Sequence, residues 1–127
     1  MTELGRAKRR LLVVDDDESL RELFRFSMEK EGFAVGEACD GLEGLQKTPE
    51  FEPDLIVVDL MMPNLGGFEM VRNLQALGFG KIPVVVITAY SDESSEQMIR
   101  QERNVVDFVK KPINYAALAA FIRGRLK

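Results

Sequence analysis

Residues 54–63 read DLIVVDLMMP, and this stretch decides the fold. Its apolar residues 55–58 follow one another without the polar alternation of a half-exposed strand, which is typical of a strand covered on both faces of a parallel sheet. Asp59 ends the run, four positions before Pro63. In parallel sheets of this kind, ligands bind outside the carboxyl ends of the strands. The function of Asp59 therefore depends on the residues that end the other strands.

Short β-branched apolar runs alternate with helical patterns along the whole chain. The expected strands are residues 10–15, 33–38, 54–60, 82–89 and 105–111. The expected helices are residues 18–32, 41–48, 66–78, 92–103 and 114–126, the second of them ending before Pro49. In the first helix, the spacing places on one face Leu20, Leu23, Phe24 and Met28. This alternation predicts an α/β fold in which helices cover both faces of a five-stranded parallel sheet.

The composition excludes several classes of function. At 127 residues the chain has the size of one domain. It contains no histidine, which excludes catalysis, metal binding or phosphate transfer by a histidine of this chain. The single cysteine, Cys39, rules out an intramolecular disulfide and a cysteine zinc site. The formal net charge of -4 disfavours direct nucleic-acid binding by this domain.

No targeting or membrane segment is expected. The sequence has no run of about 18 apolar residues, and the apolar run after the basic N-terminus is too short for a signal peptide. A cytoplasmic location is therefore expected. Residues 1–9 are expected to form a basic, solvated tail ahead of a domain at residues 10–127, with a tether to an anionic surface as the alternative.

Polar side chains end four of the expected strands. They are Asp15, Asp16 and Asp17 after the first strand, Asp59 after the third, Thr88 after the fourth, and Lys110 and Lys111 after the fifth. Grouped carboxylates repel one another unless a cation joins them, and a set of oxygen ligands alone suits Mg²⁺. A lysine and a threonine hydroxyl suit a phosphoryl group, and beside them Asp59 becomes a nucleophile that forms an aspartyl phosphate.

Four segments in this order carry a family resemblance: VVDDDES (13–19), VVDLMMPNLGGFE (57–69), VVVITAY (84–90) and DFVKKP (107–112). Together they resemble the receiver domain of two-component response regulators, over residues 10–127. The resemblance implies a flavodoxin-like, doubly wound sheet of strand order 2-1-3-4-5. It also implies a signalling module and not a true enzyme, one that catalyses only its own phosphorylation and dephosphorylation.

The resemblance also implies a role for each residue of the site. Asp59 would accept the phosphoryl group, and Lys111, rather than Lys110, would pair with it. The Mg²⁺ ion, or Mn²⁺ in its place, would be bound directly by Asp16, through water by Asp15, and by Asp59 and the backbone carbonyl of Met61. The Lys111–Pro112 peptide bond would be cis. The switch residues would be Thr88 and Phe108.

The partners implied are a histidine kinase or phosphotransfer protein, and a downstream target or fused output domain. Phosphorylation would reshape the face made by the fourth helix, fifth strand and fifth helix. Two departures from the family pattern stand out. Asn104 and Val105 replace a common Gly-Ala pair, with Asn104 expected to tolerate the left-handed conformation of a helix end. Met61 and Tyr90 occupy the variable positions that tune phosphorylation rates.

Three other functions fit parts of this pattern. A pseudo-receiver would act by protein contact without phosphorylation, and the intact set of site residues argues against it. A phosphohydrolase of the haloacid-dehalogenase kind needs a second acid two residues after its nucleophile, where this chain has Met61. A flavodoxin-type cofactor carrier needs a phosphate-binding loop after the first strand, and this chain has three aspartates there.

Overall fold

The computed structural model describes residues 8–89 and 92–126. Within them, five parallel strands form one sheet in the order β2-β1-β3-β4-β5, which confirms the predicted topology. The strands are β1 (Arg10–Val14), β2 (Ala34–Ala38), β3 (Leu55–Asp59), β4 (Val84–Thr88) and β5 (Val105–Lys110). The helices are α2 (Glu18–Lys30), α3 (Gly41–Phe51), α4 (Gly67–Ala76), α5 (Glu93–Arg100) and α6 (Tyr115–Arg125).

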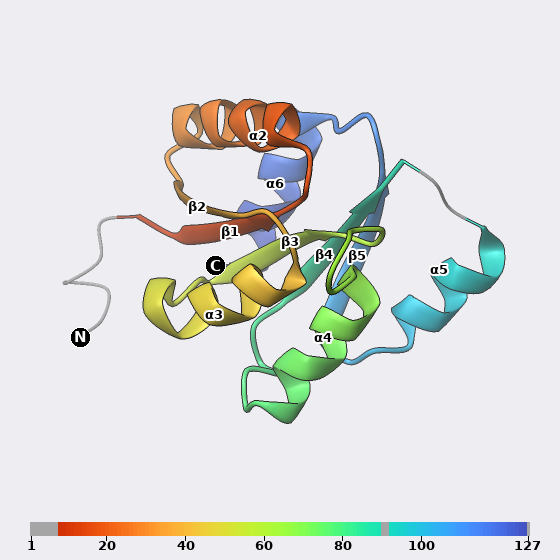
Figure 1. The fold of residues 1–127 in the computed structure, drawn as a ribbon. Coiled ribbons are helices and arrows are strands. Elements are labelled where there is room, and N and C mark those ends of the chain that lie inside the picture. Colours follow the sequence, from red (N-terminus) through yellow and green to blue (C-terminus); the bar gives the residue numbers. More distant parts are fainter. Residues whose placement is uncertain (1–7, 90–91, 127) are drawn as a thin grey trace.

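The sheet separates two layers of helices (Figure 1). Helices α2 and α6 cover one face, and α3, α4 and α5 cover the other. Alternate residues of the central strands point into two apolar clusters, one on each side of the sheet. Every residue of β3 and β4 is buried, which accounts for the unbroken apolar runs in the sequence. For the central strands β3 and β4, the two layers leave the strand ends as the places where polar groups and ligands can gather.

Helix α3 continues through Pro49, so the predicted end before that residue was wrong. Proline removes one backbone donor, but the helix ends only two residues later, which limits the loss. Buried Thr48 donates its hydroxyl to the carbonyl oxygen of Gly44 at 2.8 Å, which supports this last turn. Glu52 then ends the helix in the left-handed conformation, with φ of 54°.

In α2 the buried stripe is narrower than the sequence pattern. Phe24 and Met28 are buried, and Leu20 packs against the same cluster. Leu23 is 53% exposed, because the buried residues recur every four positions and Leu23 falls at the margin of that stripe. In the described part of the chain, we find no helix of the length and apolar character that a membrane crossing requires.

Candidate functional site

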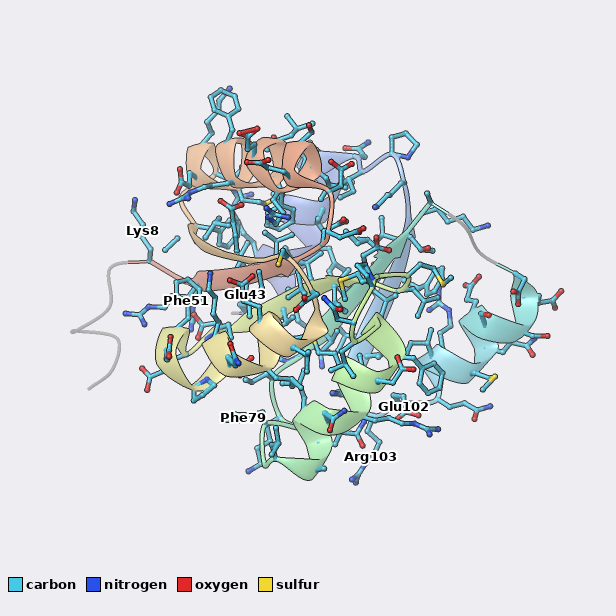
Figure 2. The ribbon with its side chains drawn as sticks, in the orientation of Figure 1. Lys8, Glu43, Phe51, Phe79, Glu102 and Arg103 are labelled. Carbon is cyan, nitrogen blue, oxygen red and sulfur yellow. The ribbon has the colours of Figure 1, made fainter. Side chains whose placement is uncertain are left out.

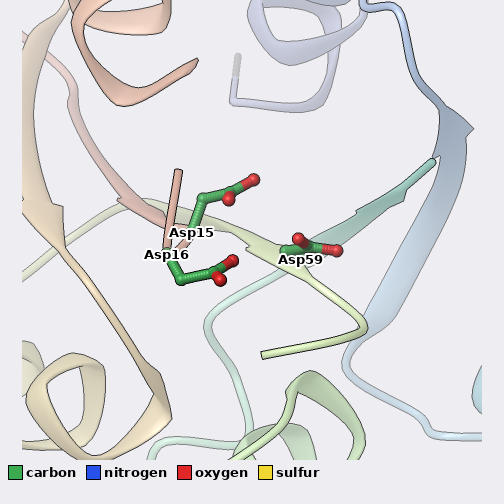
Figure 3. A group of neighbouring side chains, drawn as sticks. All are labelled: Asp15, Asp16 and Asp59. Carbon is green, nitrogen blue, oxygen red and sulfur yellow. The ribbon is translucent and has the colours of Figure 1, made fainter. Parts of the chain in front are cut away.

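The carboxyl ends of β1 and β3 bring three aspartates together. Carboxylate oxygens of Asp15, Asp16 and Asp59 lie within 4.8 Å of one another. In Figure 3 the side chains of Asp15 and Asp16 extend from the end of β1 toward the side on which Asp59 lies. Asp15 and Asp59 are buried, whereas Asp16 is exposed. The group therefore combines two buried carboxylates with one at the solvent boundary.

Asp17, the third aspartate of the run, has a different task. Its carboxylate accepts hydrogen bonds from the backbone of Ser19 and Leu20, at 3.0 and 3.3 Å, and caps the N-terminus of α2. Its own backbone N–H donates to Asp15 Oδ1 at 2.9 Å. The run of three aspartates thus divides into two residues at the site and one that starts a helix.

Lys111 joins the two buried carboxylates. Its Nζ lies 3.0 Å from Asp15 Oδ2 and 3.2 Å from Asp59 Oδ2. Lys110, the last residue of β5, is exposed. The peptide bond between Lys111 and Pro112 is cis, as predicted. Of the two lysines that follow one another here, Lys111 is the one that reaches the aspartates.

The ionisation of the site follows from its burial and its charges. Burial raises the pKa of Asp59, and the charge of Asp15 raises it further, while Lys111 and the backbone N–H of Met61 act in the opposite direction. Burial lowers the pKa of Lys111, but its contacts with Asp15 and Asp59 outweigh burial, and the net pKa is raised. The site therefore has one ammonium group, that of Lys111, beside three carboxyl groups, and this arrangement favours a further cation.

Of the other predicted site residues, Thr88 and Met61 lie near the same edge of the sheet, whereas Phe108 lies within β5. Thr88 is buried at the end of β4, and its carbonyl oxygen accepts a hydrogen bond from the Lys111 backbone N–H at 2.9 Å. Met61 follows Asp59, with its backbone N–H 3.2 Å from Asp59 Oδ1 and its side chain exposed. Phe108 is buried in the cluster on the α4 and α5 side. Tyr90 lies outside the described residues.

Gly67 brings the start of α4 against the backbone of Asp59. A Cβ atom at this position would lie 2.4 Å from the carbonyl oxygen of Asp59 and 2.9 Å from Cα of Leu60. Its N–H donates to the carbonyl oxygen of Leu60 at 3.0 Å. Only glycine allows this approach, so Gly67 helps to fix the segment that carries Asp59.

Asn104 corrects one sequence-based expectation. Its φ is not in the left-handed region, where the described non-glycine residues are Glu52 and Asn64. The side chain is buried instead, where Nδ2 donates to the carbonyl oxygen of Val71 at 3.1 Å and Oδ1 accepts from Gln75 Nε2 at 2.7 Å. The side chain of Asn104 thus links α4 to the turn before β5 by hydrogen bonds, a role that the sequence pattern did not indicate.

The residues present fit a divalent metal ion. Asp15 Oδ2 is buried, and among the described residues it accepts no hydrogen bond of good geometry, although Lys111 Nζ lies 3.0 Å away. An oxygen atom in that position has capacity for a cation. The donor set near it is carboxylate oxygen, which suits Mg²⁺ and Mn²⁺ better than softer metals.

Comparison with known proteins identifies the family to which the chain is similar. The family model described as the response regulator receiver domain matches residues 11–123. Response regulator MprA of Mycobacterium leprae (strain TN) is 38% identical over 118 residues, which cover 93% of this chain and 51% of that protein. The chain therefore spans about half the length of the curated relatives it matches.

Solved structures agree with this comparison. The CheY-like receiver domain protein of Methanospirillum hungatei JF-1 superimposes with a TM-score of 0.85 at 25% identity, covering 94% of each chain. Chemotaxis protein CheY4 of Vibrio cholerae superimposes with a TM-score of 0.84 at 26% identity, covering 95% of this chain and 100% of that one. With this fold and these strand-end residues, the chain belongs to the response regulator receiver domain family, the signalling modules of two-component systems.

Proposed function

We propose that this domain accepts a phosphoryl group on Asp59 from the phosphohistidine of a histidine kinase or phosphotransfer protein. The observation that carries the proposal is the position of Lys111 Nζ, 3.2 Å from Asp59 Oδ2 and 3.0 Å from Asp15 Oδ2. A nucleophilic carboxylate, a fixed cation and further carboxylates for a metal ion are the groups that phosphoryl transfer to an aspartate requires.

The proposed reaction transfers the phosphoryl group directly from the partner's histidine to Asp59. A carboxylate oxygen of Asp59 attacks phosphorus, the new O–P bond forms as the N–P bond breaks, and the partner's imidazole nitrogen leaves with the electron pair. Lys111, which donates to Asp59 Oδ2 at 3.2 Å, would pair with the negative charge of the transferred group. The hydroxyl of Thr88 would donate to one of the phosphoryl oxygens. Asp15, Asp16, Asp59 and the carbonyl of Met61 would hold Mg²⁺, which supplies positive charge that offsets the carboxylates and the phosphoryl oxygens.

Phosphorylation would then act through the face made by α5, β5 and α6. Thr88 ends β4, and its carbonyl oxygen is hydrogen-bonded to the backbone of Lys111, so the site is joined to the chain that follows β5. A two-state change at Thr88 and Phe108 would carry the signal to that face. The downstream target of the signal would be a fused output domain or a separate protein. A cytoplasmic location stays a prediction.

The alternative is a pseudo-receiver that acts by protein contact alone. The buried carboxylates and the bridging lysine favour phosphorylation, because two buried acids and a lysine are costly to keep in a site that has no use for their charge. The phosphohydrolase alternative is disfavoured by Met61, which has no proton to give to a leaving group.

The test is intact-protein mass spectrometry after incubation with acetyl phosphate or phosphoramidate, with and without Mg²⁺. We expect one phosphoryl adduct in the wild type, dependent on Mg²⁺ and absent in Asp59→Asn. Asp54→Asn is the matched control, since Asp54 lies at the opposite end of β3, where its Oδ2 accepts from the backbone of Arg10 at 2.8 Å. A wild type that gives no adduct with either donor and binds no beryllofluoride would leave the pseudo-receiver as the better description.

A further inference from the structure

Arg21, near the start of α2, joins two strands behind the aspartate site. Its side chain is largely buried, with 15% of its surface exposed. Nη1 donates to the backbone carbonyl oxygen of Asp15 at 2.7 Å, and Nε donates to Glu37 Oε1 on β2 at 3.2 Å. One guanidinium group therefore connects the end of β1, where Asp15 begins the site, to the neighbouring strand.

With this contact, Asp15 is held on three sides. Its backbone N–H donates to the carbonyl oxygen of Ala38 at 3.1 Å, its carbonyl accepts from Arg21, and its Oδ1 accepts from the backbone of Asp17 at 2.9 Å. Only Oδ2 is left to face Lys111 and the other carboxylates. The bond from Arg21 thus fixes the backbone from which both Asp15 and Asp16 extend.

The charge of Arg21 is largely offset by Glu37. This carboxylate lies 3.2 Å from Arg21 Nε and 3.0 Å from Arg25 Nη1, and it is about three-quarters buried. A guanidinium paired in this way exerts a weak net field on a cation site, since the opposite charges cancel at a distance. The effect of Arg21 on the aspartates is therefore one of geometry more than of charge.

We propose that Arg21 is a positioning residue for the divalent cation, which it favours by holding the Asp15–Asp16 segment in its binding geometry. The proposal rests on the proposed function of the aspartates as a Mg²⁺ site. Groups that orient metal ligands without touching the metal typically change metal affinity by about 10- to 100-fold when they are removed. Loss of the Arg21 bond leaves the segment to be ordered by the cation at the expense of binding free energy.

The test compares Arg21→Met with Arg25→Met, two variants that remove one positive charge each from the same helix. Both arginines bind Glu37, but the described hydrogen bonds of Arg25 go to Glu29 and Glu37, whereas Arg21 also reaches Asp15. Titration of the unphosphorylated protein with Mg²⁺, followed by backbone amide NMR shifts, measures the dissociation constant directly. We expect it to rise about tenfold in Arg21→Met and less than twofold in Arg25→Met.

A kinetic readout separates positioning from a general loss of structure. With acetyl phosphate as donor, the Arg21→Met protein should be phosphorylated slowly at low Mg²⁺ concentration. At saturating Mg²⁺ its phosphorylation rate should equal that of the wild type. If its dissociation constant equals that of Arg25→Met, the positioning role is wrong. The proposal is also wrong if Arg21→Met has a lower Mg²⁺ dissociation constant than the wild type. That result would mean that the arginine acts mainly by repelling the cation.

A second pair protects the test against a folding defect. Arg21→Lys keeps the charge and one donor, so it should fold and bind Mg²⁺ more weakly than Arg25→Lys, by about threefold. Equal constants in these two variants would contradict the proposal. A wild type that binds no Mg²⁺ would refute the proposed function itself, whereas equal binding by the paired variants, with the wild type active, refutes only the role of Arg21.

Discussion

The guanidinium of Arg100 lies over the ring of Phe108, with 5.6 Å from Cζ to the ring centroid. Arg100 is the last residue of α5, and its Nε also lies 2.9 Å from Glu96 Oε2 one turn earlier. Phe108 belongs to β5 and packs in the cluster on that side of the sheet. The aromatic side chain proposed as a switch is thus covered by a residue of the helix whose position it would control.

Replacing Arg100 should weaken the attachment of α5. We expect Arg100→Ala to lower the free energy of unfolding by about 1 kcal/mol, from a cation–π contact of about 0.5–1 kcal/mol and an exposed i,i+4 ion pair of about 0.3–0.5 kcal/mol. Glu96→Ala removes the ion pair, together with one acidic group of the first turn, and leaves the contact of Arg100 with Phe108, so it serves as the control in urea denaturation. Equal losses in the two variants would mean that the contact with Phe108 contributes nothing to stability.

The raised pKa of Asp59 predicts a stability difference that depends on pH. In the folded state this carboxyl binds protons more tightly than in the unfolded chain, so its contribution to stability is present at low pH and is lost as pH rises through the folded pKa. Without metal ions, Asp59→Asn should therefore be more stable than the wild type at pH 7. The advantage should shrink as pH falls toward the ordinary pKa of an aspartate.

Denaturation of both proteins in EDTA, from pH 4 to pH 7.5, measures this difference. Partly exposed acids with lowered pKa, such as Asp40 and Glu43, change the stability of both proteins equally and cancel in the comparison. The difference reports the ionisation of Asp59, whose pKa is raised by burial and by the charge of Asp15. A constant difference across the pH range would contradict the stated cause.

Mg²⁺ should stabilise the wild type by mass action. At a concentration 100 times its dissociation constant, the expected gain in unfolding free energy is about 2.7 kcal/mol. Asp16→Asn should lose most of this gain, whereas Asp17→Asn should retain it, since asparagine caps a helix as well as aspartate does. Thermal unfolding with and without Mg²⁺ checks the order of the variants. A gain lost equally in both would place the ion elsewhere in the run of aspartates.

Gly67→Ala should disturb both stability and chemistry. Its Cβ would lie 2.4 Å from the carbonyl oxygen of Asp59, so the start of α4 or the Asp59 segment has to move, at a cost of about 1–3 kcal/mol. The phosphorylation rate should fall as well, because Asp59 moves with its backbone. Gly124→Ala in α6 is the control: the new methyl meets nothing within 4 Å, and alanine favours a helix by up to about 1 kcal/mol. A Gly67→Ala protein as stable as Gly124→Ala would contradict this account.

The strands and the residues at their ends could be predicted, because both depend on the local pattern of apolar and polar residues in the sequence. Apolar runs rich in β-branched residues located β3 and β4 most directly, because a doubly covered strand has few other possible sequences. The edge strand β2, with the sequence AVGEA, gave a weaker pattern. Since parallel strands end at one edge, the positions of Asp15, Asp59 and Lys111 in the sequence were enough to predict that they meet. The choice of Lys111 over Lys110 needed the family resemblance, as neighbouring residues of a strand differ only in the face they point to.

Contacts between distant segments were not predictable from pattern. The hydrogen bonds of Asn104 and Arg21 join residues 33 and 6 positions apart to backbone carbonyls, and any polar residue offers such groups. Asn104 was assigned a backbone conformation because asparagine often adopts it, but burial of its amide decided its role. Pro49 was misjudged for a similar reason: a rule for helix interiors was applied one turn from a helix end.

The hydrogen bonds between Asn104 and α4 belong to a set of contacts near the C-terminal end of α5. Glu102, two residues beyond the end of this helix, accepts from Arg72 and Gln75 of α4 at 3.3 and 3.1 Å, and Figure 2 shows its side chain beside α4. Ile99, in the last turn, is the one buried residue of α5. The side-chain contacts described here therefore hold α5 at its C-terminal end. If phosphorylation displaced the end of β4 and tilted α5 about this attachment, the N-terminal end of the helix would move further than its C-terminal end.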